Sequence, residues 1–167
     1  MISLKTIFIT GFMGAGKTTI GKELGKKLGV TVVDTDHLIE GKSGMPVKEI
    51  FRTYGEKHFR ELETNILKEI PLVNTIVTTG GGLILSEENR NYMLEKGDLI
   101  FLYCDIDELY ARLQNDTDRP LIQEKTKGEI NELYQSRIPF YEQCSLKINT
   151  TRKTLHETAE EIAAWLK

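Results

Sequence analysis

Residues 11–18 read GFMGAGKT, and this stretch decides the fold. It fits the phosphate-binding pattern G-x-x-x-x-G-K-[ST]. Glycines allow the backbone to wrap closely around a phosphate with its N–H groups pointing inward, and a helix that starts there adds the positive end of its dipole. An apolar strand candidate at residues 4–10 precedes the stretch, and Ile20, Leu24 and Leu28 follow it at helical spacing. Because strand, loop and helix follow one another in this order, we predict a P-loop.

Two residues of this loop have distinct expected tasks. Lys17 would reach the β- and γ-phosphates of a nucleotide, and the Thr18 hydroxyl would ligate Mg²⁺. The chain contains neither a D-x-x-G switch nor an N-K-x-D guanine-reading motif, which argues against a signalling GTPase. We therefore predict an enzyme that uses ATP with Mg²⁺. The expected nucleotide-binding set at the loop also includes Gly14, Ala15, Gly16 and Thr19.

Short apolar runs alternate with helical patterns along the whole chain. Further strand candidates lie at residues 31–34, 75–79, 99–103 and 145–149. Such alternation is typical of βαβ units and a parallel sheet. A length of 167 residues, 40% of them hydrophobic and 28% charged, suits one globular domain. We expect a single α/β domain over residues 1–167.

Two segments interrupt the alternation. Residues 36–70 are mostly helical and lie between the second and third strands, where we expect them to bind the acceptor of the phosphoryl group. Residues 115–128 (NDTDRPLIQEKTKG) are polar and lack helical periodicity. A segment of this kind in a compact domain is a functional lid or a disordered linker, and the prediction is a lid.

Composition limits the partners and the compartment. The net charge is −3, so no overall basic field favours nucleic acid or an anionic membrane. No stretch approaches the roughly 18 apolar residues of a membrane span, and no signal-peptide cleavage site follows the first apolar run. Cys104 and Cys144 have neither zinc-ligand spacing nor the density of a disulfide scaffold. We expect a cytoplasmic monomer that acts on a small molecule.

Two carboxylates leave the second strand together, at Asp34 and Asp36. Ligands of open α/β sheets bind beyond the carboxyl ends of the strands, so both acids should face the phosphate loop. One can serve a metal ion and the other a substrate. The alternative interpretation is a helix N-cap beside a solvated acid.

Seven motifs in this order and spacing make the chain resemble the shikimate kinases over nearly its whole length. The resemblance implies a P-loop NTPase fold related to adenylate kinase, with a five-stranded parallel sheet in the order 2-3-1-4-5 flanked by helices. The motifs are GFMGAGKT at residues 11–18, Asp34-Thr35-Asp36, Phe59-Arg60-Glu61-Leu62-Glu63, Gly80-Gly81-Gly82, Arg119-Pro120-Leu121, Arg137-Ile138-Pro139-Phe140-Tyr141 and Asn149-Thr150-Thr151-Arg152.

The resemblance also implies an activity, namely ATP-dependent phosphorylation of the 3-hydroxyl of shikimate in the synthesis of chorismate and the aromatic amino acids. It implies that Thr18 and Asp34 hold Mg²⁺, with Asp34 acting through water. Arg119 would reach from the lid to the phosphates, and Arg112 and Arg152 would flank the adenine. The implied catalytic residues are Lys17, Asp36 and Arg119, and the implied shikimate-binding residues are Asp36, Arg60, Gly81, Gly82 and Arg137.

The chemistry of these residues agrees with the implied roles. Planar arginines recognise carboxylates bidentately, which suits Arg60 and Arg137 to the carboxylate of shikimate. Asp36 can accept a hydrogen bond from a hydroxyl and orient it, with or without taking its proton. The structural alternatives are a solvated helix charge for Arg60 and a tight turn for residues 80–82.

Two other functions remain open from the sequence. Another small P-loop kinase, such as a gluconate kinase or a nucleoside monophosphate kinase, would use the same phosphate loop, and gluconate also carries a carboxylate and hydroxyls. A catalytically silent nucleotide-binding module would keep the loop and lose the acceptor residues. ATP consumption that depends on an added acceptor separates the silent module from both kinases.

Overall fold

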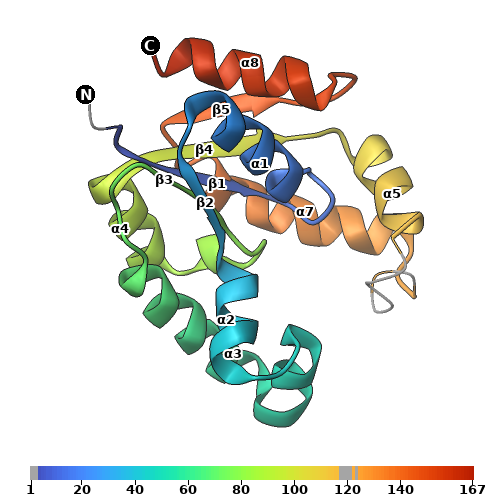
Figure 1. Ribbon diagram of the computed structural model, residues 1–167. Helices are drawn as coiled ribbons and strands as arrows, with labels where there is room; N and C mark the ends of the chain where they lie inside the picture. Colours follow the sequence, from blue (N-terminus) through green and yellow to red (C-terminus); the bar gives the residue numbers. More distant parts are fainter. Residues whose placement is uncertain (1–3, 117–121, 123) are drawn as a thin grey trace.

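A five-stranded parallel sheet forms the centre of the molecule. The computed structural model describes residues 4–116, 122 and 124–167 (Figure 1). The sheet order is β2-β3-β1-β4-β5, which confirms the predicted order 2-3-1-4-5. The strands are β1 (Thr6–Gly11), β2 (Thr31–Asp34), β3 (Thr75–Thr78), β4 (Gly97–Tyr103) and β5 (Leu146–Asn149).

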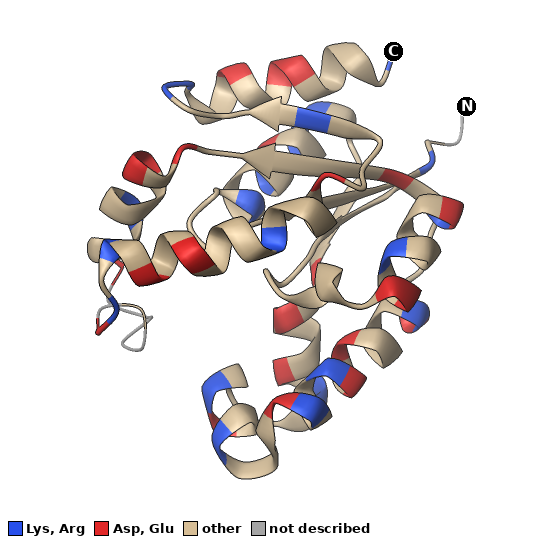
Figure 2. Ribbon diagram, turned by 180° about the vertical axis from the view of Figure 1, so that it is seen from behind, with Lys and Arg blue, Asp and Glu red and all other residues tan. Residues whose placement is uncertain are grey.

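Helices cover both faces of this sheet. On one face α1 packs beside α8, and α4 and α7 lie on the other (Figures 1 and 2). Hydroxyl caps set several of the helix starts: Ser86 accepts a hydrogen bond from the Asn89 N–H, and Thr154 forms a capping box with Glu157. The helices are α1 (Lys17–Leu28), α2 (Thr35–Ser43), α3 (Val47–Glu69), the 3₁₀ helix η1 (Leu83–Leu85), α4 (Glu87–Lys96), α5 (Ile106–Gln114), α7 (Lys127–Tyr141) and α8 (Leu155–Trp165).

Burial and strand register bring the functional edge together. Residues 99–102 of β4 are completely buried, as their unbroken apolarity predicts for a central parallel strand. In the parallel register Asp34 pairs with Thr78, and Gly11 pairs with Leu102. The carboxyl ends of β1, β2 and β3 therefore meet at one edge of the sheet, where the phosphate loop and both acids of the second strand begin.

The segment between the second and third strands is helical, as expected. It consists of α2 and α3, which Figure 1 shows extending away from the sheet. The backbone departs from helical geometry at Gly55, so α3 is two helical pieces joined at a kink. These helices share a small apolar cluster of their own, which anchors α3 and with it the residues that α3 carries toward the sheet. The buried members of that cluster are Ile39, Ile50, Phe59 and Ile66.

The predicted lid borders α5 and α7. Helix α7 begins at Lys127, one residue before the predicted end of the segment, because Thr126 forms a capping box with Glu129. Ile122 is buried, with 7% of its surface exposed. Residues 117–121 and 123 lie outside the described residues, and so does the predicted phosphate contact Arg119.

Acidic and basic residues are interspersed on the surface. Figure 2 shows both signs of charge alternating along α3, α4 and α7. Within the ranges that the structure describes, no helix combines the length and the apolarity needed to cross a bilayer.

Candidate active site

The phosphate loop joins β1 to α1, and its backbone accepts hydrogen bonds from Lys17, the first residue of α1. Gly16 precedes the helix with φ 91°, in the left-handed region that favours glycine. The Lys17 ammonium donates to the carbonyl oxygens of Gly11, at 2.8 Å, and Phe12, at 3.1 Å. The ammonium therefore lies against the backbone of the loop. This arrangement fits a nucleoside triphosphate bound at the start of α1.

A hydroxyl and a carboxylate meet beside the loop. The Thr18 hydroxyl lies 3.4 Å from Asp34 Oδ2, which also accepts a hydrogen bond of 2.7 Å from the Thr78 hydroxyl. The other oxygen, Asp34 Oδ1, accepts from the His37 N–H and caps α2, so the N-cap alternative accounts for one of the three contacts of Asp34. In the described part of the chain no three His, Cys, Asp or Glu side chains form a metal cluster. Thr18 and Asp34 fit Mg²⁺, which binds through few protein oxygens and completes its shell with phosphate and water.

The predicted acceptor residues come from four separate segments and converge on one place. Asp36 stands in the first turn of α2, and its Oδ1 is 2.7 Å from where a Cβ on Gly80 would lie. A Cβ on Gly81 would lie 3.6 Å from Arg137 Nη1 and 3.7 Å from the Gly11 carbonyl oxygen. The group therefore adjoins the phosphate loop. We call it the acceptor cluster, and it comprises Asp36, Arg60, Glu63, Gly80, Gly81, Gly82 and Arg137.

Arg60 is held by contacts within α3 and against the glycine turn. Its guanidinium pairs with Glu63 three residues later, on the same face of the helix, and lies over the rings of Phe51 and Phe59. A Cβ on Gly82 would lie 2.4 Å from Arg60 Nη2, so a side chain at this position would displace the guanidinium. With 27% of its side chain exposed and a buried partner, Arg60 is more than a solvated helix charge.

Arg137 approaches the cluster from α7. Its guanidinium lies over the Phe12 ring of the phosphate loop, with 5.7 Å between its Cζ and the ring centroid. One helical turn later the Tyr141 hydroxyl donates to the Gly81 carbonyl oxygen and ties α7 to the glycine turn. Arg137 Nε is buried without a hydrogen-bond partner among the described residues. A buried guanidinium N–H costs free energy unless it is paired, so this group favours an anionic ligand.

Glu63 was not among the predicted site residues, yet it is a buried carboxylate of the cluster with a strongly shifted pKa. Only 1% of its surface is exposed, and its Oε2 has no hydrogen-bond partner among the described residues. Burial raises the pKa of Glu63 to about 7, while the Arg60 guanidinium opposes that rise. The sequence offered one signal, the i, i+3 spacing of Arg60 and Glu63, but spacing alone does not distinguish a buried pair from a surface pair.

We expect the stability of the protein to depend on the ionisation of Glu63. Because its folded-state pKa lies above the ordinary value of 4.5, the folded state holds the proton more tightly than the unfolded state. This stabilising contribution is present at low pH and is lost as the pH rises from 4.5 to about 7. Across that window Glu63→Gln should gain up to about 3 kcal/mol in free energy of unfolding relative to the unmodified protein.

Urea unfolding of both proteins at several pH values between 4 and 8 measures this difference. Glu61→Gln, at an exposed position of the same helix, controls for the loss of one negative charge on α3. Parallel stability profiles for Glu63→Gln and the unmodified protein would contradict the expected buried ionisation.

The two arginines predicted to flank the adenine lie on neighbouring elements. Arg112, on α5, donates to the Gly14 carbonyl oxygen at 3.0 Å and so contacts the phosphate loop directly. Arg152 is exposed in the loop between β5 and α8 and has φ 60°, an uncommon value for a residue other than glycine. Both arginines contact the carboxylate of Glu108, a residue that sequence reasoning did not select. Glu108 therefore connects Arg112, which contacts the phosphate loop, to the backbone of Arg152.

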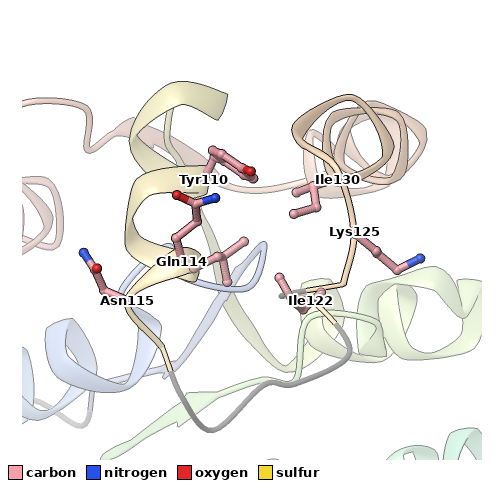
Figure 3. A pocket seen from close by; sticks show the side chains of 7 residues that line it. Tyr110, Gln114, Asn115, Ile122, Lys125 and Ile130 are labelled. Carbon is pink, nitrogen blue, oxygen red and sulfur yellow. The ribbon is translucent and has the colours of Figure 1, made fainter.

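A pocket of about 420 Å³ lies on the side of α5 that faces α7. Figure 3 shows Tyr110 and Gln114 of α5 on one side and Ile122 and Ile130 on the other. Its described lining includes none of the predicted phosphate, metal or acceptor residues, so it is separate from the chemistry described above. Leu113, which also lines it, would contact a Cβ on Gly14 at 3.4 Å, and the pocket thus borders the back of the phosphate loop.

Comparisons with known proteins agree with this geometry. Residues 13–167 match the family model described as shikimate kinase. A shikimate kinase of Bacillus anthracis is 46% identical over 159 residues, which cover 95% of this chain and 96% of that protein. The crystal structure of shikimate kinase from Bacteroides thetaiotaomicron superposes with a TM-score of 0.89 at 35% identity, covering 98% of each chain.

A second solved structure extends the comparison to a bound ligand. Shikimate kinase from Acinetobacter baumannii, solved in complex with shikimate, gives a TM-score of 0.91 at 34% identity over 98% of this chain and 93% of that one. These relatives have the P-loop NTPase fold of the adenylate kinase type, which the sheet order already indicates. The chain therefore belongs to the shikimate kinase family of ATP-dependent kinases.

Proposed function

We propose that this chain transfers the γ-phosphoryl group of ATP to the 3-hydroxyl of shikimate, and that the residues of the phosphate loop and the acceptor cluster carry out the transfer. The observation that carries the assignment is the convergence of two arginines and Asp36 on a glycine turn that adjoins the phosphate loop. Shikimate presents one carboxylate and three hydroxyls, and the cluster presents two guanidinium groups that suit the carboxylate and one acceptor, Asp36, that suits a hydroxyl. Membership of the family supports the same substrate.

At the phosphate end, the loop supplies positive potential without covalent chemistry. The N–H groups at the start of α1 and the Lys17 ammonium stabilise the charge of the β- and γ-phosphates. Thr18 and Asp34 would hold Mg²⁺, which supplies charge neutralisation between the phosphates when bound. The Lys17 ammonium donates to the carbonyl oxygens of Gly11 and Phe12, which keeps it beside the loop where the phosphates would bind.

At the acceptor end, charge fixes the substrate and Asp36 orients it. Arg60 and Arg137 bind the carboxylate, Glu63 holds Arg60 in place, and the turn at Gly81 and Gly82 leaves room for the guanidinium groups. Asp36 accepts a hydrogen bond from the reacting hydroxyl and directs its oxygen toward the γ-phosphate. Because both cations are half-buried and held by contacts before binding, little reorganisation is needed when the acceptor binds.

The same proposal covers the remaining parts of the chain. Residues 36–70 form the acceptor-binding segment, and residues 115–128 form a lid that brings Arg119 to the phosphates and excludes water when both substrates are bound. We take residues 1–167 to be one kinase domain that works as a cytoplasmic monomer on a small molecule, without nucleic acid or a membrane. The net charge of −3 and the mixed surface charges support this view.

The experiment that tests the assignment is ADP release from Mg-ATP with separate acceptors. With shikimate we expect acceptor-dependent turnover that far exceeds the turnover with gluconate, with AMP or without acceptor. Shikimate methyl ester should be a poor acceptor, because the arginines lose the charge that they bind. Preferential turnover of gluconate would reject the substrate and keep the kinase, and ATP consumption independent of any acceptor would reject both.

Arginine variants provide the matched control for the ester. Charge-assisted hydrogen bonds contribute roughly 1.5–3 kcal/mol each, so Arg60→Ala and Arg137→Ala should each lower kcat/KM for shikimate about ten- to a hundredfold. With the ester both substitutions should cost much less. The double variant should lose less than the sum of the singles, since both arginines bind one group. Equal losses with acid and ester would assign the arginines to folding or phosphate binding instead.

A further inference from the structure

One carboxylate connects the two arginines beside the phosphate loop. Glu108, in the first turn of α5, places its Oε2 3.3 Å from Arg112 Nη2, and its Oε1 accepts a hydrogen bond of 3.4 Å from the backbone N–H of Arg152. Arg112 in turn donates to the carbonyl oxygen of Gly14. A continuous set of contacts therefore runs from the β5–α8 loop through Glu108 and α5 into the phosphate loop.

The orientation of Glu108 is fixed from a third side. The buried Cys104 thiol donates to Glu108 Oε2 at 2.9 Å. This hydrogen bond, followed by the charge of Arg112 and the Arg152 N–H, holds the pKa of Glu108 below its usual range, so the carboxylate is ionised at neutral pH. About a third of the Glu108 side chain remains exposed, so a ligand can approach this group of residues from the solvent.

The loop that carries Arg152 needs such support. Its backbone at Arg152 lies in the left-handed region, which costs a residue with a Cβ free energy unless neighbouring contacts hold it. The loop is tied to the end of β4 by the Thr150 N–H, which donates to the Tyr103 carbonyl oxygen, and by the Thr151 hydroxyl, which accepts from the Asp105 N–H. Glu108 adds the contact at the strained residue itself.

We propose that Glu108 is a positioning residue for the adenine end of the nucleotide, because it fixes the relative placement of Arg112 and Arg152. This inference rests on the proposed function, in which those two arginines flank the adenine. Guanidinium planes stack on aromatic rings, and a stacked pair binds only when the spacing of the two planes matches the thickness of the ring. Glu108 contacts the Arg112 guanidinium and the Arg152 backbone N–H, so it fixes the Arg112 side chain relative to the backbone from which the Arg152 side chain extends.

A purely structural role for Glu108 predicts something different. Acids in the first turn of a helix stabilise it through the helix dipole, and Asp107 occupies the same turn. Among the described residues Asp107 pairs with Lys127 of α7 and forms no ion pair with Arg112 or Arg152, so Asp107→Asn is the matched control for a lost charge in this turn. A dipole role would lower stability equally in both variants and leave nucleotide affinity unchanged.

Steady-state kinetics of Glu108→Gln, Glu108→Ala and Asp107→Asn test the proposal. Glu108→Gln should raise KM for ATP about three- to tenfold, with kcat and KM for shikimate within about twofold of the unmodified enzyme. Glu108→Ala, which also loses the acceptor for the Arg152 N–H, should raise it further. Inhibition constants then distinguish an effect on the adenine end of the nucleotide from an effect on its phosphates. In the Glu108 variants the inhibition constant of ADP should rise together with KM for ATP, whereas that of inorganic tripolyphosphate should not change.

Arg112→Ala distinguishes a failure of the proposed role of Glu108 from a failure of the proposed adenine site. If Arg112→Ala raises KM for ATP and Glu108→Gln does not, the inference about Glu108 is wrong and the proposed adenine site stands. If neither variant changes KM for ATP, both are wrong. Equal weakening of ADP and tripolyphosphate by Glu108→Gln would also overturn the inference, because it would place the effect on the phosphate loop. The double variant Glu108→Gln/Arg112→Ala should lose less than the sum of the singles.

Discussion

Lys17→Ala should lower kcat by about 10³-fold or more while the protein still folds. Removal of one preorganised charge at a group that gains charge in the transition state typically costs 10²–10³-fold, and a cation on a transferring phosphoryl group lies at or above that range. The ammonium binds two backbone carbonyl oxygens of the loop, and in the variant both can accept hydrogen bonds from water instead. The loss should therefore appear in catalysis more than in stability.

The measurement is ADP release at saturating ATP and shikimate, together with a thermal melt. Lys22→Ala, at an exposed position later on the same helix, should retain full activity and serves as the matched control. Turnover of the Lys17 variant close to that of the unmodified enzyme would show that the phosphate loop does not serve the reacting phosphates. A large drop in melting temperature would assign the loss to folding, and Lys17→Arg, which keeps the charge, would then separate charge from structure.

Asp36→Asn should lower kcat about 10²-fold or more, the usual scale of a general-base or hydroxyl-orienting contribution. The substitution keeps the volume of the side chain and one carbonyl oxygen, and it removes the negative charge. Asp36 lies in the first turn of α2 against the Gly80 turn, so its position depends on the fold and is not expected to shift in the variant. The effect should therefore report on the chemistry of the acceptor hydroxyl.

Kinetics with each substrate varied in turn measure this effect. A fall in kcat with little change in KM for ATP is the expected pattern, and a change confined to KM for ATP would mean that Asp36 belongs to the nucleotide side. Glu61→Gln, an exposed acid on α3, is the control for a lost negative charge near the acceptor segment and should leave kcat unchanged. The dependence of kcat on pH in both proteins separates a group that takes the proton from one that only orients the hydroxyl.

The sequence by itself determined the phosphate loop, the sheet and the family. Each rests on short-range patterns: glycines before Lys17 require a tight loop, apolar runs of four to seven residues require buried strands, and the order of elements requires parallel pairing. The sheet order was confirmed because right-handed crossovers and the family resemblance leave few alternatives. The acids at Asp34 and Asp36 were placed at the sheet edge by the same reasoning, since a strand that ends at Asp34 can only deliver them there.

Only the tertiary structure decided which charged residues are buried and which partners they have. Arg60 and Glu63 share a helix face in any α-helix, but the fold buries Glu63 and sets the Arg60 guanidinium against the glycine turn, where a side chain on Gly82 would displace it. Glu108 and Arg152 are 44 positions apart, and no local pattern connects them. The pKa of a carboxylate depends on its desolvation and on charges brought near it by the fold, so neither Glu63 nor Glu108 could be selected from the sequence alone.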